Sequence, residues 1–216
     1  MNSTQIIQKT ALFIASEFAT EGSGHDWFHI DRVRRLALRI GQIEGSEPFI
    51  TEMGALLHDL DDWKLTASES HFPVKAKKWL TDLEVEADLA SLILNVIEDV
   101  SYLGAGTETP VRSVEAAIVQ DADRLDAIGA IGIARTFAYG GYKNRLIYDP
   151  TIAPVMHADF QTYKNSIAPT INHFYEKLLL LKDRMNTDTA KSIAEQRHRF
   201  MENYLEQFFN EWEAKK

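Results

Sequence analysis

Apolar residues recur every three to four positions along most of the chain, which is the period of an amphipathic α-helix. The period-two alternation that marks half-buried β-strands is essentially missing. We therefore predict an all-α fold, with helices over residues 3–18, 26–40, 48–59, 74–80, 84–100, 110–125, 160–181 and 187–212.

Local start and stop signals support several of these boundaries. Ser3 or Thr4 can cap the first helix, and Asp26 can cap the second. Pro110 is favourable at a helix start, because its fixed φ suits the first turn. Glycines open the stretch from 140 to 154, which lacks helical periodicity and is predicted to be irregular.

Length and composition fit one globular domain. The chain has 216 residues, of which 45% are hydrophobic, and it shows no repeat, low-complexity segment or clear linker. We predict a single domain over residues 1–216. Its chemistry-bearing motifs lie in a core over about 20–140, and two long C-terminal helices lie in about 159–213.

Composition also limits which cellular compartment and which binding partners we expect. The chain has no cysteine, which excludes disulfides, thiolate metal sites and cysteine nucleophiles. Its N-terminus does not resemble a leader, and its apolar stretches are shorter than the ~20 residues that span a bilayer. We expect a cytoplasmic protein without a membrane partner. The net charge of −9 argues against binding nucleic-acid polymers, but it allows a small anionic substrate held by a metal and local cations.

Three predicted helices carry side chains that can bind a metal. His58 and Asp59 end the apolar run that begins at Gly54, His29 lies on the apolar face of the second helix, and Asp123 lies between the apolar residues Ala122 and Leu125. Burying an unpaired carboxylate costs several kcal/mol unless a positive charge compensates. Imidazole and carboxylate ligands suit one divalent ion such as Mn, Mg, Ni, Fe, Co or Zn.

Simpler roles exist for each of these residues. His58 and Asp59 can be the polar end of a helix, and Asp123 can pair with Arg124. A lone buried histidine such as His29 is commonly bonded to a backbone carbonyl. His25, one helical turn upstream, competes with it as a ligand.

The order of these motifs resembles the HD-domain superfamily of metal-dependent phosphohydrolases. The segment from His29 through Arg32 and Val33 is similar to the first motif of that family. The segments 55–60 and 122–127 are similar to its second and closing motifs. Together the three segments span roughly the first two thirds of the chain.

The resemblance implies a compact helical bundle with one divalent metal ion, held by His29, His58, Asp59 and Asp123. It also places an acidic residue near the attacking water, which makes Asp62 the candidate catalytic base, although Asp61 and Asp62 can equally be solvated acids.

Basic residues near the motifs or in the glycine-rich segment are candidates for binding the substrate. Each of them can instead be an ordinary solvated surface residue. The candidates are His25, Lys64, Arg135, Lys143 and Arg145.

The implied substrate is a phosphorylated small molecule, with a nucleotide as the best fit, cleaved by a pyrophosphohydrolase or nucleotidase reaction. Tyr139, Tyr142 and Tyr148 can stack a base, or they can be packing and loop anchors. Two alternatives to an enzyme are a non-catalytic metal- or nucleotide-binding module and a helical interaction protein. The interaction protein would form a homodimer through its aromatic C-terminal helix.

Overall fold

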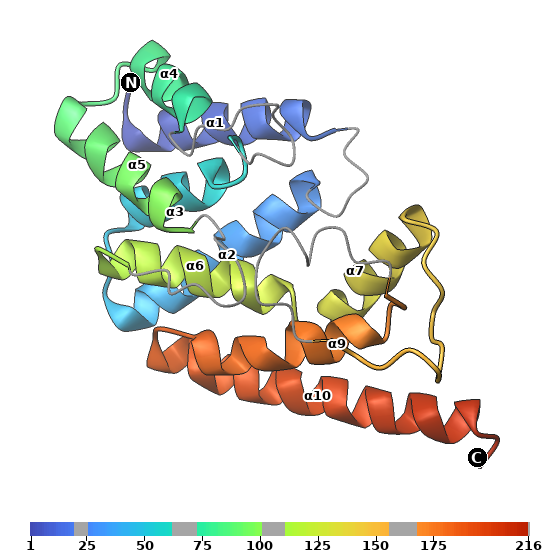
Figure 1. Cartoon of the computed structure of the whole chain (residues 1–216). Helices are drawn as coiled ribbons and strands as arrows, with labels where there is room; N and C mark the ends of the chain where they lie inside the picture. The colour runs from blue at the N-terminus through green and yellow to red at the C-terminus, as the bar shows by residue number, and fades with distance from the viewer. Residues whose placement is uncertain (20–25, 62–72, 101–110, 156–167, 216) are drawn as a thin grey trace. The chain divides into compact units, whose positions relative to one another are not determined.

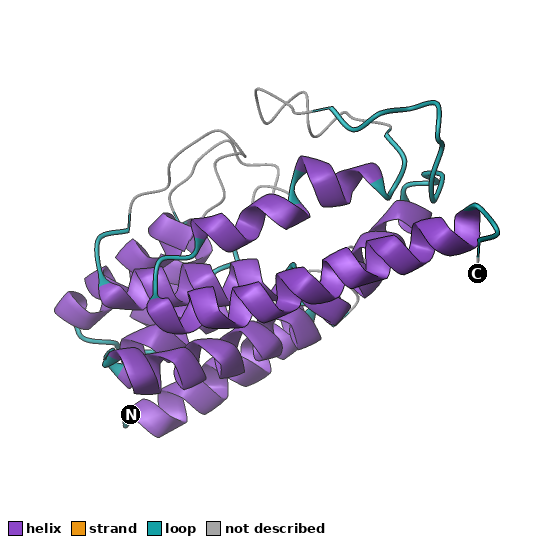
Figure 2. Cartoon of the chain, turned by 90° about the horizontal axis from the view of Figure 1, so that it is seen from below, coloured by secondary structure: helices purple, strands orange, loops and turns teal. Residues whose placement is uncertain are grey.

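The computed structural model describes residues 1–19, 26–61, 73–100, 111–155 and 168–215, and every regular element in these ranges is helical (Figures 1 and 2). The predicted all-α fold is confirmed. The chain forms two compact units whose boundary falls within one helix, since the first unit includes Asp123 and the second includes Arg124. The helices that belong to the first unit, wholly or up to Asp123, are α1 (Ser3–Glu17), α2 (Trp27–Glu44), α3 (Pro48–Leu57), α4 (Val74–Asp82), α5 (Ala87–Val100) and α6 (Val114–Asp126).

Helix α3 is the centre of the first unit. It is buried from Phe49 to Leu57 except at Glu52, because apolar residues cover all of its faces. Helices α1, α2 and α5 pack around it (Figure 1). Gly54 permits the close approach of α5, since a Cβ at this position would lie 2.6 Å from a methyl carbon of Val96.

The starts of α1 and α2 show how short-range signals position these helices. Asn2, rather than the predicted Ser3 or Thr4, caps α1: its side chain accepts a hydrogen bond from the Gln5 amide, and the Gln5 side chain accepts one from the Asn2 amide. Asp26 caps α2 as predicted. The reciprocal bond with Gln5 explains why Asn2 takes the first position.

The second unit contains α7 (Gly129–Tyr142), α9 (Asn172–Glu176), the 3₁₀ helix η1 (Leu178–Arg184) and α10 (Asp188–Trp212). Helix α10 packs against α7 and η1. Phe174 of α9 stacks on Tyr204 of α10 with 5.9 Å between ring centroids, and Phe137 of α7 contacts both rings. Aromatic packing therefore joins three helices of this unit.

The predicted helix over residues 160–181 is wrong for the part of that range that the structure describes, from 168 onward. Helix α9 has only five residues and ends where Lys177 leaves the helical region, at φ −145° and ψ −57°. Asn172 donates to the carbonyl oxygen of Ile152, and Glu176 accepts from the amide of Val155. These bonds tie α9 to residues 152–155, which have no regular secondary structure, and a 3₁₀ helix follows α9.

Two further boundaries differ from the prediction. Helix α6 begins at Val114 rather than at Pro110, and the Ser113 side chain accepts a hydrogen bond from the Ala116 amide at its first turn. Gly140 and Gly141 lie inside α7, so the irregular segment begins at Lys143. The capping side chain marks the start of α6 better than the proline does.

Candidate metal centre

Three of the four predicted metal ligands come together in the first unit. His29 on α2, and His58 and Asp59 at the end of α3, each offer a ligand atom, and these atoms lie within 4.8 Å of one another. Asp123 on α6 lies beside them, with its Oδ1 atom 3.4 Å from His29 Nε2 and 4.0 Å from His58 Nε2.

The separations suit one shared ion. Asp59 lies 3.4 Å from His29 Nε2 through one oxygen and 3.4 Å from His58 Nε2 through the other. Hydrogen bonds from nitrogen to oxygen usually span about 2.7–3.2 Å. Ligand atoms bound at about 2.1 Å to the same ion lie roughly 3.0–4.2 Å apart. A divalent cation therefore fits the space between these groups.

The ring of His58 is oriented for coordination by its own helix. Its Nδ1 atom lies 2.8 Å from the carbonyl oxygen of Ala55, which can only accept, so the neutral ring donates from Nδ1. The lone pair is then on Nε2. This atom is buried and makes no hydrogen bond to any part of the chain that the structure describes. A buried acceptor beside carboxylates calls for a positive partner, and a metal ion provides one.

His29 is brought to the centre by the way α2 begins. The Asp26 side chain accepts a hydrogen bond from the His29 amide at 2.8 Å, which fixes the first turn. From there the buried face of α2 runs through His29, Val33, Ala37 and Ile40. The helical period thus places the imidazole on the core side, as the sequence predicted.

The cluster is closed on one side and open on the other. The side chain of His29 is fully buried and that of Asp59 is 9% exposed, whereas 34% of the Asp123 side chain is exposed. Catalytic metal sites keep a position open to water or substrate, while structural sites are closed by protein ligands. Asp123 is therefore the part of the cluster that solvent reaches most easily.

Comparison with known proteins agrees with this geometry. The family model described as HD domain matches residues 27–128, a range that holds all four candidate ligands. The YpgQ protein of Bacillus subtilis is 40% identical over 197 residues, which cover 90% of this chain and 88% of YpgQ. The chain belongs to the HD-domain family.

Solved structures of other HD proteins share the fold over nearly the whole chain. An HD-superfamily hydrolase from Bacillus thuringiensis is 46% identical, with a TM-score of 0.78, and the match covers 99% of this chain and 100% of that one. The structure of Bacillus subtilis YpgQ in complex with ADP has a TM-score of 0.75 and 36% identity, with coverage of 95% and 97%. The HD resemblance and the HD fold predicted from the motifs are confirmed.

Three residues predicted to act in this HD domain, His25, Asp62 and Lys64, lie outside the described residues. Their roles stay predictions. Asp61, which the sequence left as a possible solvated acid, is described and accepts hydrogen bonds from the backbone of α4.

Arg135, predicted to bind substrate, is engaged in the second unit. Its guanidinium lies 2.6 Å from Oδ2 of Asp126, whose side chain is only 4% exposed. This ion pair joins the last turn of α6 to α7. Its contact therefore gives Arg135 a structural role, and its contact with substrate stays a prediction.

Lys143 and Arg145 gather with two tyrosines at the end of α7. The ammonium of Lys143 lies 5.1 Å from the ring centre of Tyr142, and the guanidinium of Arg145 lies 5.7 Å from that of Tyr139. These distances are in the range of cation–π attraction. Both tyrosines are exposed, so the group combines positive charge with accessible aromatic surface.

Tyr148 packs inside the second unit. Its ring meets those of Phe208, Phe209 and Trp212 on α10, with centroid separations of 5.1–6.0 Å. It therefore anchors the segment after α7, which is the alternative role that the sequence left open for it.

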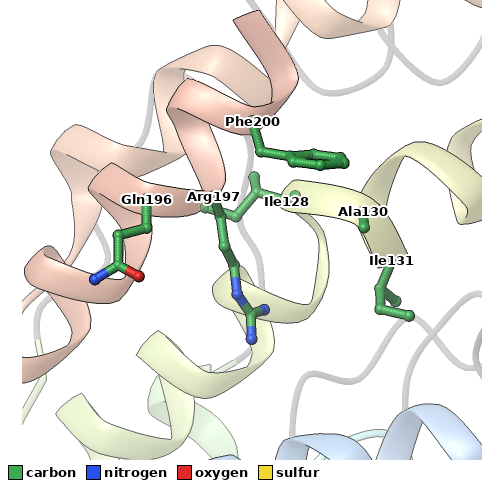
Figure 3. A pocket seen from close by; sticks show the side chains of 7 residues that line it. Ile128, Ala130, Ile131, Gln196, Arg197 and Phe200 are labelled. Carbon is green, nitrogen blue, oxygen red and sulfur yellow. The ribbon is translucent and has the colours of Figure 1, made fainter. Parts of the chain in front are cut away.

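A pocket of about 320 Å³ lies between the start of α7 and α10 (Figure 3). Its walls are mainly apolar, and it has no acidic residue or histidine; they are formed by Ile128, Gly129, Ala130, Ile131, Gln196, Arg197 and Phe200. The Arg197 guanidinium donates to the carbonyl oxygen of Leu125, which ties α10 to the end of α6. The pocket therefore lacks the groups that metal chemistry requires.

No helix in the described ranges combines the length and the apolar character needed to cross a bilayer.

Proposed function

We propose that this HD-domain protein is a metal-dependent phosphohydrolase that acts on a nucleotide, with a nucleoside triphosphate preferred. The observation that carries the proposal is the group of two imidazoles and two carboxylates whose ligand atoms lie at the separations expected around one ion. In this proposal His29, His58, Asp59 and Asp123 hold a single divalent cation.

A bound divalent ion polarises a phosphoryl oxygen and lowers the pKa of water from 15.7 to about 7. The chain's own residues set where that chemistry happens. The Ala55 carbonyl holds the His58 ring in the tautomer that presents Nε2. The exposed side of Asp123 leaves access for a phosphate group.

Asp62 is the proposed catalytic base. It lies three residues after Asp59, and one water proton passes to its carboxylate while the water oxygen forms a new bond to phosphorus. The bond between phosphorus and the leaving oxygen breaks, and the leaving group keeps the electron pair and takes up a proton. Hydrolysis is balanced in this way without any further reactant.

The remaining predicted contacts bind substrate in this proposal. Lys143 and Arg145 supply positive charge for phosphate, and the rings of Tyr139 and Tyr142 offer faces for a base. His25, Lys64 and Arg135 are the other proposed contacts. The ADP complex of the related YpgQ protein supports a nucleotide as the ligand class.

Metal content tests the first part of the proposal. Purified protein loaded with Mn²⁺ and freed of excess ion should hold one equivalent by elemental analysis, and His58→Ala should hold none while keeping its helix content. His198→Ala is the matched control, because His198 is also buried and also lies on a helix, but in the second unit. Full stoichiometry in His58→Ala would overturn the ligand assignment.

A substrate screen tests the second part. Nucleoside tri-, di- and monophosphates and sugar phosphates are incubated with the Mn²⁺-loaded protein, and phosphate and pyrophosphate are measured separately. We expect turnover of nucleotides, fastest for triphosphates. Much faster turnover of sugar phosphates would contradict the nucleotide substrate, and only the proposal of metal-dependent phosphohydrolysis would remain. Metal binding without any turnover would favour a non-catalytic binding module.

A further inference from the structure

Asp61 connects the turn that carries Asp59 to a distant helix. Its Oδ1 accepts a hydrogen bond from the Lys75 amide at 3.0 Å, and its Oδ2 accepts one from the Ala76 amide at 2.9 Å. These donors lie 14 and 15 residues away in the sequence, in the first turn of α4. Both oxygens of this carboxylate are therefore committed to one helix end.

Helix α4 depends on this contact because it has no local cap. The first four amides of a helix lack partners within it, and a side chain at the N-cap usually accepts one or two of them. The N-cap of α4 is Pro73, which forms no side-chain hydrogen bond. Asp61 takes over this role from outside the helix, and its negative charge suits the positive end of the helix dipole.

Helix α4 is itself held in place by packing within the first unit. Trp79 stacks on Phe13 of α1 with 3.9 Å between ring centres, and its indole N–H donates to Thr10 Oγ1 at 3.0 Å. Ala76 and Leu80 are buried on the same helix. A group bonded to the start of α4 is therefore held by a packed element rather than by a loop.

The other end of the turn carries the candidate ligands. His58 is bonded to the Ala55 carbonyl, and the Leu60 amide donates to the Leu57 carbonyl oxygen at 3.1 Å, with the Leu60 side chain buried. Asp59 lies between these fixed points, two residues before Asp61. The turn is thus held by α3 on one side and by α4 on the other.

From this arrangement we infer that Asp61 is a positioning residue for the metal centre, a conclusion that rests on the proposed metal-dependent function. By tying the turn to α4, it keeps the Asp59 carboxylate within reach of both His29 and His58. Asp61 does not bind the ion, since its two oxygens serve the amides of Lys75 and Ala76. Residues that orient metal ligands typically change metal affinity by about 10- to 100-fold when they are replaced.

The test compares Mn²⁺ affinity in wild-type protein, Asp61→Ala and Asp61→Asn by calorimetric titration of the full chain. We expect Asp61→Ala to bind roughly 10-fold or more weakly at unchanged stoichiometry. Asp61→Asn should be intermediate, because its side-chain carbonyl can still accept one of the two hydrogen bonds. It also serves as the milder variant if the alanine protein does not fold.

Asn2→Ala is the matched control. It removes the cap of α1, in the same unit, without touching the turn after α3. Both alanine variants should lower the melting temperature, but only Asp61→Ala should weaken Mn²⁺ binding and speed hydrogen exchange at the Leu60 amide in metal-free protein.

The outcomes separate the two proposals. Equal Mn²⁺ affinity in wild type and Asp61→Ala, with a lower melting temperature, would make Asp61 only a helix cap and would leave the proposed function intact. Loss of the bound equivalent in a folded Asp61 variant would make it a ligand, which also overturns the positioning role. No Mn²⁺ binding by the wild-type protein would overturn the proposed function and the positioning role with it.

Discussion

At the scale of single residues, neighbouring carboxylates in this protein take different roles according to what their oxygens meet. Asp59 faces two imidazoles at 3.4 Å, whereas Asp61 accepts two backbone amides. Imidazole nitrogens beside a carboxylate can share a cation with it, but amide donors satisfy the carboxylate directly. Both side chains are aspartates, so the groups around each carboxylate, rather than its chemical identity, decide whether it faces the candidate metal site or caps a helix.

Asp62 gives the sharpest prediction about catalysis. Asp62→Asn keeps the size and shape of the side chain but removes the basic carboxylate. We expect bound metal to be retained, kcat to fall by about 10²–10⁴-fold and KM to change much less. Steady-state kinetics and elemental analysis on the same preparation measure both effects.

Near-normal kcat would make Asp62 a bystander. Loss of metal together with activity would make it a ligand or a structural acid.

The pair formed by Arg135 and Asp126 predicts an effect on stability. Arg135→Met should lower the free energy of unfolding by up to about 3 kcal/mol, because it removes a charged partner from a buried carboxylate. Adding Asp126→Asn should recover part of the loss, since the buried carboxylate that lost its guanidinium partner is then gone. Urea unfolding of the two single variants and the double variant measures this coupling.

If instead both single variants are as stable as the wild type while Arg135→Met alone raises KM, then Arg135 serves the substrate rather than the fold.

At the candidate metal centre, the sequence could indicate which side chains lie near one another, whereas their role as metal ligands stays a prediction. The helical period places His29 on the buried face of α2, and the motif resemblance groups it with His58, Asp59 and Asp123, whose side chains lie near it in the structure. The role of Asp61 was not predictable, because its donors lie 14 and 15 residues away. The one available signal was the absence of a capping residue before α4.

At the scale of helices, the close packing of α3 against α5 predicts a cost for a single added carbon. In Gly54→Ala the new Cβ would meet Val96 Cγ1 at 2.6 Å, and Val96 is 1% exposed. We expect α3 and α5 to be forced apart, at a cost of about 1–3 kcal/mol as in other overpacked cores. Because α3 carries His58 one turn later, Mn²⁺ affinity should fall as well. Thermal unfolding and metal titration measure the two effects.

Gly141→Ala is the control for this prediction. Gly141 also lies in a helix, but a Cβ there would meet nothing within 4 Å. The alanine should be neutral or stabilise by up to about 1 kcal/mol, because it restricts the unfolded chain. If both variants behave alike, the spacing between α3 and α5 is not limiting.

The wrong prediction of a helix over residues 160–181 also has a physical cause. Four consecutive leucines span 178–181, and a run of apolar residues fits a period of 3.0 as well as one of 3.6 over so short a length. The structure selects the shorter period, in which Leu178 and Leu181 share a buried face. By contrast, α10 has 25 residues and a Thr187 cap, and its predicted start and end are confirmed within one residue.

At the scale of the whole molecule, the chain divides into two compact units, and the four candidate ligands all belong to the first. The prediction of one domain over residues 1–216 stays a prediction. The boundary between the two units falls inside α6, between Asp123 and Arg124, where no linker composition marks it. Continuous helical periodicity hides a boundary of this kind. Whether the units unfold together is open to measurement.

Metal binding supplies that measurement. An ion that binds only the folded state stabilises it by RT ln(1 + [L]/Kd), which is about 2.7 kcal/mol at 100 times Kd. We expect saturating Mn²⁺ to slow amide exchange in α2 and α3 by up to roughly 100-fold, and to have no effect in Asp59→Ala. Amides of α10 should gain less, since that helix belongs to the second unit and holds no candidate ligand. Equal protection in α10 would show that the two units unfold as one cooperative domain, and unchanged exchange in α2 and α3 would contradict the metal centre itself.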